Sequence, residues 1–141
     1  MIILDTSVLS AAMRPDKNPI AIVWLNRQNP AHLRTTVISL NELAYGVERL
    51  PDGPDRAALA LRFDQLMRHP TTSRILPLLR DGALAAAKCR ATAIRVTAQC
   101  DIPDALIGGI ALSNGASVAT RNVKHFQHFG VPLINPWDVG N

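Results

Sequence analysis

Three acidic residues occupy comparable places among the 11 Asp and Glu residues of this 141-residue chain. Asp5 follows the apolar run 2–4, which is typical of a strand buried on both faces of a parallel sheet. Glu42 and Asp104 each stand in the first turn of a predicted helix. Ligand sites of parallel α/β sheets lie outside the carboxyl ends of the strands, where helices begin. We therefore expect these three side chains to meet in one cleft.

Three carboxylates in one cleft repel one another unless a divalent cation neutralises them. Ligands that are all oxygen favour Mg²⁺ or Mn²⁺ over zinc, which prefers His and Cys. Such an ion keeps several waters and bridges to phosphate, and one of those waters can be activated as a nucleophile. The three acids thus predict metal-assisted attack on a phosphate ester.

Each acid, taken alone, also has a structural explanation. Asp5 is placed to cap the following helix, and Asp104 to favour the positive end of its helix dipole. Glu42 completes a capping box with Ser39, which is expected to open the helix. These explanations stay open for the single residues. The joint placement favours the metal site.

A polar segment follows the predicted strand 117–119 and should open onto the same edge of the sheet. Thr120 offers a hydroxyl to a metal-bound water, and Asn122 offers an amide oxygen. Arg121 faces either phosphate or solvent. His125 has no ligand-like spacing to other residues, and we expect it to pack in a surface loop.

The elements that must position these residues alternate between strand and helix. We expect strands at 2–4, within 32–37, at 74–79, 117–119 and 131–134, and helices at 6–13, from 19, at 39–50, 54–68, 81–98 and 103–114. This alternation predicts a three-layer α/β/α fold with a largely parallel central sheet. No linker divides the chain, so residues 1–141 are expected to form a single domain.

The charge balance suggests an anionic partner. The chain has 15 Lys and Arg against 11 Asp and Glu, a net charge of +4, and 12 of the 15 cations are arginine. Guanidinium groups bind phosphate through paired hydrogen bonds, although a GC-rich genome also favours arginine codons. No apolar run approaches the ~18 residues of a membrane span, and Asp5 interrupts the leading apolar stretch, which excludes a secretion signal. Two cysteines are too few for a disulfide framework, so we expect a cytoplasmic protein with no membrane partner.

Four segments, in order, resemble the PIN-domain family. They are MIILDTSVL at 1–9, Glu42-Leu43 with Gly46, DALI at 104–107, and ATRN at 119–122. More narrowly, the chain resembles VapC-type ribonuclease toxins of bacterial type II toxin–antitoxin pairs. The ending GVPLINPW at 130–137 is similar to the closing strand of the FitB-like branch. The resemblance covers essentially the whole chain.

The resemblance implies an endoribonuclease that depends on Mg²⁺ or Mn²⁺, acts on RNA, forms a homodimer and is silenced by a cognate antitoxin. It implies that the metal is held by an acidic triad, with further residues in support: Asp5, Glu42 and Asp104, then Thr6, Thr120 and Asn122. Many relatives carry Asp near position 122. Asn122 keeps the ligand oxygen without the charge, which leaves open a catalytically weak PIN module that binds RNA or a protein partner.

Glycines and aromatic residues add weaker expectations. Gly108 and Gly109 stand in mid-helix, and we expect them to allow tight packing of the helix on the sheet, whereas Gly46 should keep the groove beside Glu42 open. Tyr45 is a candidate for stacking on a base.

Overall fold

Five parallel strands form the centre of the computed structural model, which describes residues 1–138. Their order across the sheet is β3-β2-β1-β4-β5, and every neighbouring pair is parallel. The strands are β1 (Ile2–Leu4), β2 (Leu33–Thr36), β3 (Ile75–Leu76), β4 (Ser117–Ala119) and β5 (Leu133–Ile134). The predicted parallel sheet is confirmed. β3 is a short edge strand, as expected from the proline that follows it at position 77.

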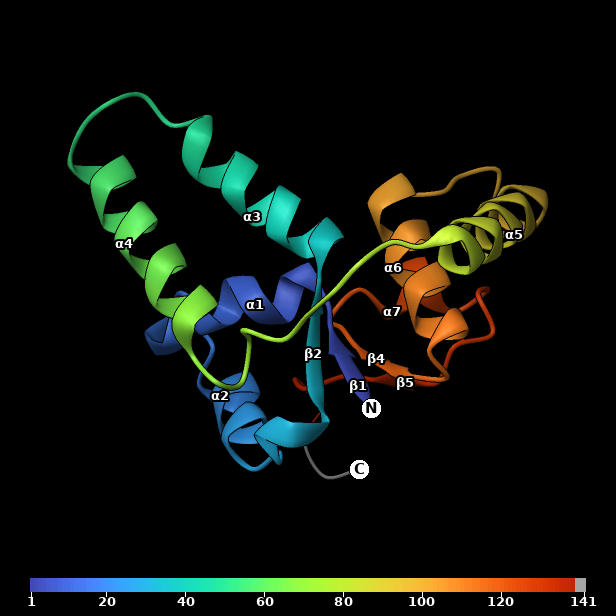
Figure 1. The fold of residues 1–141 in the computed structure, drawn as a ribbon, viewed down its shortest axis with the longest axis horizontal. Coiled ribbons are helices and arrows are strands. Elements are labelled where there is room, and N and C mark those ends of the chain that lie inside the picture. The colour runs from blue at the N-terminus through green and yellow to red at the C-terminus, as the bar shows by residue number, and fades with distance from the viewer. Residues whose placement is uncertain (139–141) are drawn as a thin grey trace.

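Helices cover both faces of the sheet (Figure 1). One face carries α1 (Thr6–Ala12), α2 (Pro19–Asn26), α3 (Val37–Glu48) and α4 (Pro54–Arg68), and the other carries α5 (Arg80–Thr97), α6 (Ile102–Ser113) and α7 (Val123–Phe126). Short 3₁₀ turns span Pro15–Lys17 and Pro30–His32. Within residues 1–138, no helix is both long and apolar enough to cross a membrane.

Two apolar cores separate the three layers, because successive strand residues point to opposite faces. Leu4 and Ala119 belong to the core under α1–α4, whereas Ile3 and Val118 belong to the core under α5–α7. The predicted three-layer α/β/α architecture is therefore confirmed.

The helix pair α5 and α6 packs very closely, and glycine makes this possible. A Cβ atom on Gly109 would lie 2.6 Å from the Cβ of Ala86, and one on Gly108 would lie 2.7 Å from Cδ2 of Phe129. Both distances are shorter than any tolerable carbon contact. Tight packing at these two glycines is confirmed, but the expected partner is wrong: their close neighbours are α5 and Phe129, and not the sheet.

Helix α3 begins two residues before the position predicted for it. Thr36 is its N-cap, and the Thr36 Oγ1 accepts a hydrogen bond of 3.2 Å from the backbone N–H of Ser39. Glu42 consequently lies in the second turn, and its carboxylate bonds Thr6 instead of the Ser39 amide. The predicted capping box is wrong. The helix can start at Val37 because a threonine already caps it there.

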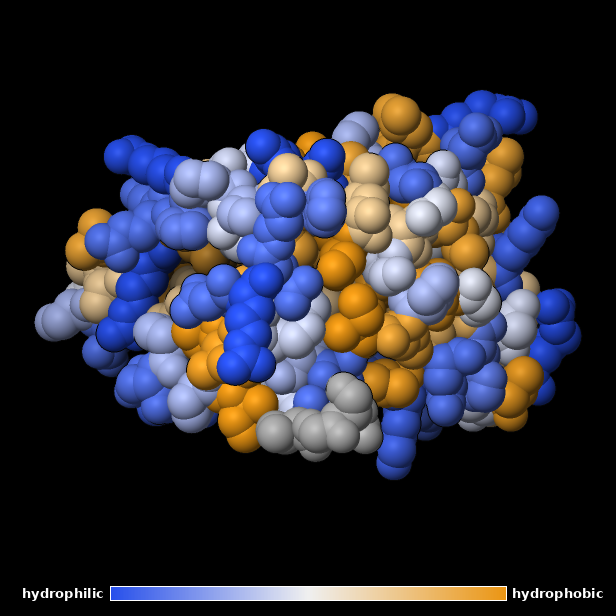
Figure 2. All heavy atoms as spheres, turned by 90° about the horizontal axis from the view of Figure 1, so that it is seen from below, coloured by the Kyte–Doolittle hydropathy of each residue, from blue (hydrophilic) through white to orange (hydrophobic). Residues whose placement is uncertain are grey.

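The surface seen in Figure 2 mixes polar and apolar side chains. Four large apolar residues remain exposed in or beside α5: Leu79, Leu84, Ile94 and Val96. Exposed apolar side chains gathered on one element are a common mark of an interface.

Candidate functional site

The candidate site lies where the sheet changes direction. The chain runs from β1 outward to β2 and β3, then returns to place β4 on the opposite side of β1. Asp5 directly follows β1 and Thr120 directly follows β4, and both side chains are buried at the carboxyl edge of the sheet. Such a switch point is where open parallel sheets bind ligands.

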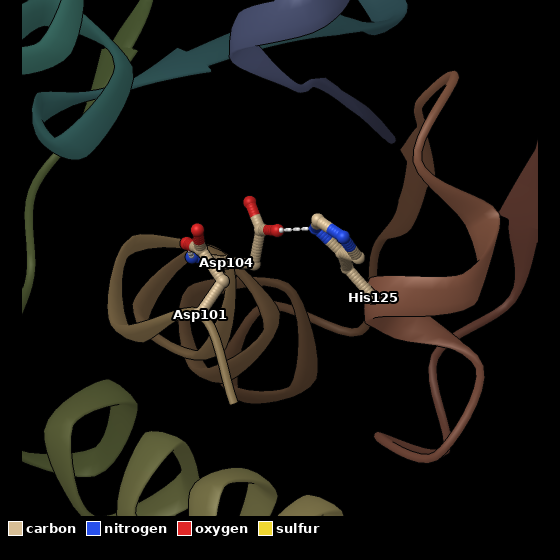
Figure 3. A group of neighbouring side chains, drawn as sticks. All are labelled: Asp101, Asp104 and His125. Atoms are coloured by element: carbon tan, nitrogen blue, oxygen red, sulfur yellow. Dashed lines mark hydrogen bonds and ion pairs between the residues drawn. The ribbon is translucent and has the colours of Figure 1, made fainter. Parts of the chain in front are cut away.

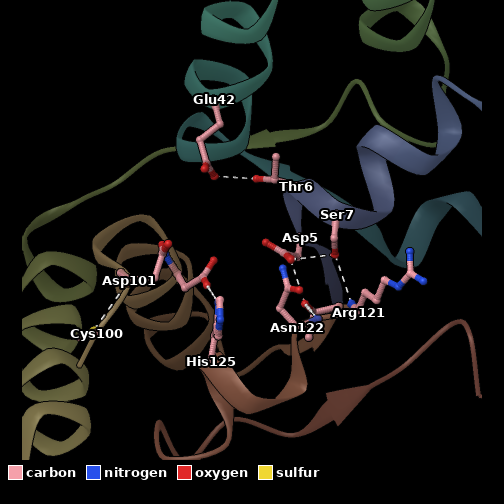
Figure 4. Close-up of polar contacts among 11 residues, drawn as sticks. Asp5, Thr6, Ser7, Glu42, Cys100, Asp101, Arg121, Asn122 and His125 are labelled. Atoms are coloured by element: carbon pink, nitrogen blue, oxygen red, sulfur yellow. Dashed lines mark hydrogen bonds and ion pairs between the residues drawn. The ribbon is translucent and has the colours of Figure 1, made fainter. Parts of the chain in front are cut away.

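Asp5 is held through only one of its two carboxylate oxygens (Figure 4). Its Oδ2 accepts hydrogen bonds from Ser7 Oγ at 2.9 Å and Thr120 Oγ1 at 2.8 Å. Its Oδ1 is buried and accepts no hydrogen bond within residues 1–138. Asp5 stands at the N-cap position of α1, yet its side chain makes no capping bond, so the capping explanation is wrong. A buried carboxylate oxygen without a donor is costly unless a ligand satisfies it.

Two hydroxyl groups are fixed in turn by the backbone that follows β4. Thr120 Oγ1 accepts from the N–H of Asn122 at 2.9 Å, and Ser7 Oγ accepts from the N–H of Arg121 at 3.1 Å. The Thr120 hydroxyl proton is therefore directed at Asp5. The polar segment after β4 lies at the site, as its position after a strand predicted.

Glu42 reaches the site from α3, where Thr6 of α1 orients it. Thr6 Oγ1 donates to Glu42 Oε1 at 2.7 Å and lies 2.8 Å from Ser39 Oγ. Burial raises the pKa of Glu42, the hydrogen bond from Thr6 lowers it, and the charge of Asp5 raises it further. Glu42 points from α3, and Asp5 from the end of β1, toward the same space (Figure 4).

Asp104 reaches the site from the first turn of α6 and is 7% exposed. Burial, followed by the charge of Asp5, raises the pKa of Asp104 to about 7, against the opposing hydrogen bond from His125. The charge of Asp5 thus acts on both other acids. The three carboxylates that the sequence singled out face one region (Figure 4), although within residues 1–138 the group of possible ligands that lie within 4.8 Å of one another includes only Asp104 of the three.

His125 is exposed, as expected of a residue that packs at the surface, but its contact with an acid of the site was not expected. It lies on α7, and its Nδ1 is 2.7 Å from Oδ2 of Asp104 (Figure 3). Asp101, the N-cap of α6, completes a group whose ligand atoms lie within 4.8 Å of one another. No spacing motif links His125 to residues 21 positions away, so the only signal was its place just after the polar segment.

These side chains fit a divalent cation. Oxygen donors dominate, one buried oxygen of Asp5 has no partner within the described residues, and the pKa values of Glu42 and Asp104 are raised first by burial and then by the negative charge of Asp5. A hard cation such as Mg²⁺ or Mn²⁺ relieves this repulsion and takes oxygen ligands. Asp5, Glu42 and Asp104 are the candidates to hold it, with Asp101 and His125 beside them.

The amino-acid sequence matches the PIN domain family over residues 2–131. The chain belongs to the PIN-domain family. The PIN domain described here is 32% identical to the plasmid stability protein StbB of Pseudomonas syringae pv. tomato, over 99% of this chain and 100% of StbB. It is 31% identical to toxin FitB of Neisseria gonorrhoeae (97% and 99% covered) and 28% identical to VapC ribonuclease Y4jK of Sinorhizobium fredii (98% and 99% covered).

Solved structures give the same assignment. FitAB bound to the IR36 DNA fragment superimposes with a TM-score of 0.88 at 29% identity, covering 100% of this chain and 99% of that one. FitAcB from Neisseria gonorrhoeae gives a TM-score of 0.86 at 31% identity, with 99% and 100% covered. The resemblance of this PIN domain to the VapC and FitB branch is therefore confirmed.

Proposed function

We propose that this PIN-domain protein is the endoribonuclease toxin of a toxin–antitoxin pair and hydrolyses RNA with the help of Mg²⁺ or Mn²⁺. The observation that carries the proposal is the convergence of Asp5, Glu42 and Asp104 at one sheet edge, with Oδ1 of Asp5 buried and unpartnered within residues 1–138. The similarity to VapC ribonuclease Y4jK and toxin FitB supports the same activity.

Some residues of the site are proposed to hold the metal ion, and others to position those ligands or the attacking water. Asp5 would hold the ion as its central ligand through Oδ1, and Asp104 would be the second ligand. Glu42, oriented by Thr6, holds the ion or orients the attacking water. A bound divalent ion makes water nucleophilic near neutral pH and stabilises the charge that develops on the phosphate. In-line attack of water on phosphorus would break the bond to the 3′ oxygen, which takes up a proton as it leaves, and would give a 5′-phosphate and a 3′-hydroxyl.

Cleavage of RNA with and without metal tests the activity. Total cellular RNA is incubated with the wild type and with Asp5→Asn, in Mg²⁺, in Mn²⁺ and in EDTA. We expect metal-dependent fragments from the wild type, none in EDTA, and a loss of at least a hundredfold in Asp5→Asn. Asp64→Asn, which removes an exposed carboxylate of α4, is the matched control and should cleave normally.

A wild type that cleaves no RNA in either metal would contradict the nuclease proposal. Asn122, which offers an amide oxygen without a charge, favours a second candidate in that case: a PIN module that binds RNA or a protein partner without cutting. Binding of RNA measured without any cleavage would support that second function. Circular dichroism of each variant checks that the fold is retained.

We extend the proposal to the partners. FitB is found in complexes named FitAB, and we assign this chain a cognate antitoxin and an action in the cytoplasm, where its RNA substrate is. We propose that residues 1–141 form one PIN domain.

The exposed apolar residues of α5 support a homodimer. Light scattering after gel filtration should give twice the mass of one chain. The mass of a single chain would contradict the dimer.

A further inference from the structure

A pocket of about 570 Å³ opens beside the acidic site, between α1, α3, α4 and the segment after β4. Three arginines from distant parts of the chain line it: Arg14, Arg49 and Arg121. Within residues 1–138, none of the three guanidinium groups forms an ion pair or donates a hydrogen bond, whereas the nearby Arg56 is paired with Glu48 and Asp52. Three unpaired cations in one pocket are typical of a site for an anionic ligand.

Aromatic side chains line the same pocket. Tyr45 is 67% exposed on α3, one residue before Gly46. The guanidinium carbon of Arg121 lies 5.2 Å from the centre of the Trp137 ring, so the indole holds this arginine through a cation–π contact. Arginines that contact a phosphate backbone and an aromatic ring that stacks on a base are the two components of single-strand binding sites.

The pocket is continuous with the candidate catalytic residues. Thr6, Ser7 and Glu42 belong to its lining, so one bound molecule touches both the arginines and the acidic site. Gly46 leaves room in the wall, because a Cβ atom there would contact nothing within 4 Å. The groove is open beside Gly46, and whether glycine is required for this stays a prediction.

We propose that this pocket binds a nucleotide next to the scissile phosphate of single-stranded RNA, with the arginines on its phosphates and Tyr45 against its base. The inference rests on the proposed ribonuclease function, because it takes the acidic site as the place of cleavage. RNA fits better than an acidic peptide. An acidic peptide would place its carboxylates against Glu42 and leave Tyr45 without a stacking partner. Single-stranded RNA offers both charged phosphates for the arginines and flat bases for Tyr45.

Fluorescence anisotropy with a labelled single-stranded RNA decamer in EDTA measures the binding separately from cleavage. We expect Arg14→Gln, Arg49→Gln and Arg121→Gln each to raise the Kd about tenfold, as for a lost charge-assisted hydrogen bond. The slope of log Kd against log salt should become shallower by about 0.7 for each phosphate contact removed. Arg27→Gln makes the same charge change beyond the end of α2, outside the pocket lining, and should bind as the wild type does.

Variants of Tyr45 separate stacking from general attraction. Tyr45→Ala should weaken binding roughly fivefold or more, whereas Tyr45→Phe, which keeps the ring, should leave the Kd unchanged. All of these residues are exposed, so the variants are expected to fold.

The outcomes distinguish this inference from the proposed function. Unchanged RNA affinity in all three arginine variants would overturn the proposal that this pocket binds RNA. Metal-dependent cleavage by the wild type would still support the ribonuclease function. Binding that is lost in these variants supports the pocket even if no RNA is cut. Competition by poly-glutamate as strong as by RNA of equal charge would overturn the RNA assignment in favour of an acidic protein partner.

Discussion

Asp5 has one carboxylate oxygen fixed by two hydroxyl groups, and within residues 1–138 no group donates a hydrogen bond to the other. The two donors, Ser7 and Thr120, come from different elements, so a rotation of the carboxylate would break both bonds at once. Groups that are held in place before a ligand arrives need no reorganisation when it binds. Thr120 therefore acts as a positioning residue.

Replacing Thr120 tests this positioning role. In Thr120→Val, Asp5 loses one donor and the N–H of Asn122 loses its acceptor. We expect the free energy of unfolding to fall by about 1–3 kcal/mol and the Kd for Mn²⁺ to rise. Urea unfolding and calorimetric titration measure the two effects. Thr92→Val, a change in α5, is the control, and unchanged Mn²⁺ affinity in Thr120→Val would contradict a positioning role.

The raised pKa of Asp104 predicts a pH dependence of stability in the absence of metal. Because the pKa is about 7 in the folded protein and 3.8 in the ordinary state, the folded protein binds more protons between about pH 4 and 7. The free energy of unfolding should fall as pH rises through this window, by on the order of a few kcal/mol, and level off above it.

Asp104→Asn, which cannot ionise, isolates that contribution. Its free energy of unfolding should lack this part of the fall between pH 4.5 and 7.5, so at pH 7.5 in EDTA the variant should exceed the wild type. Asp64→Asn should retain the wild-type profile. Parallel profiles for the wild type and Asp104→Asn would show that Asp104 does not carry the dependence.

The sequence predicted which acidic residues belong to the site better than it predicted which side chains contact one another there. Asp5, Glu42 and Asp104 could be selected because each stands next to a predicted strand end or helix start. His125 could not, because its contact with Asp104 depends on where α7 packs against α6, and no local pattern encodes that distance. The pocket arginines were missed as a group for the same reason.

At the scale of elements, α3 shows why boundaries are harder to predict than helices. Two overlapping capping patterns occur, Thr36 with Ser39 and Ser39 with Glu42, and residues 37 and 38 are apolar residues suited to the end of a strand. Packing favours the cap at Thr36, because β2 ends at this residue and Ile38, already in the helix, contacts the apolar core. The alternation of strands and helices was predictable because it follows from hydrophobic periodicity alone.

Glycines in two helices should respond in opposite ways to alanine. Gly46→Ala adds a methyl group in open space within α3 and should raise the free energy of unfolding by about 0.5–1 kcal/mol. Gly109→Ala would press a methyl group against the backbone oxygen of Gly82 and should lower it by about 1–3 kcal/mol or more. Urea unfolding of both variants measures the contrast. Equal effects would contradict the packing described for α5 and α6.

At the scale of the molecule, a net charge of +4 conceals two regions of opposite sign. Carboxylates gather at the sheet edge, and unpaired arginines line the adjoining pocket. A basic surface with an acidic centre attracts a polyanion and then requires a cation where the phosphate meets the acids.

Binding of a metal ion should therefore stabilise the whole fold. Mn²⁺ at about 100 times its Kd should add about 2.7 kcal/mol to the free energy of unfolding, seen as a rise of several degrees in Tm. EDTA should reverse the rise, and Asp5→Asn should not show it. A Tm that does not respond to Mn²⁺ in the wild type would argue against a divalent site.

The pairing of β1 with β4 also has a consequence for biosynthesis. The bond between Asp5 and Thr120 joins residues 115 positions apart, so the ribosome makes the acid long before the hydroxyl that holds it. Until β4 emerges and docks against β1, the carboxyl edge of the sheet is incomplete and Asp5 is not held in place. The order of strands along the chain thus delays assembly of the site until β4 has been made. For the ribonuclease proposed above, this order means that the growing chain lacks an assembled acidic site until β4 has docked.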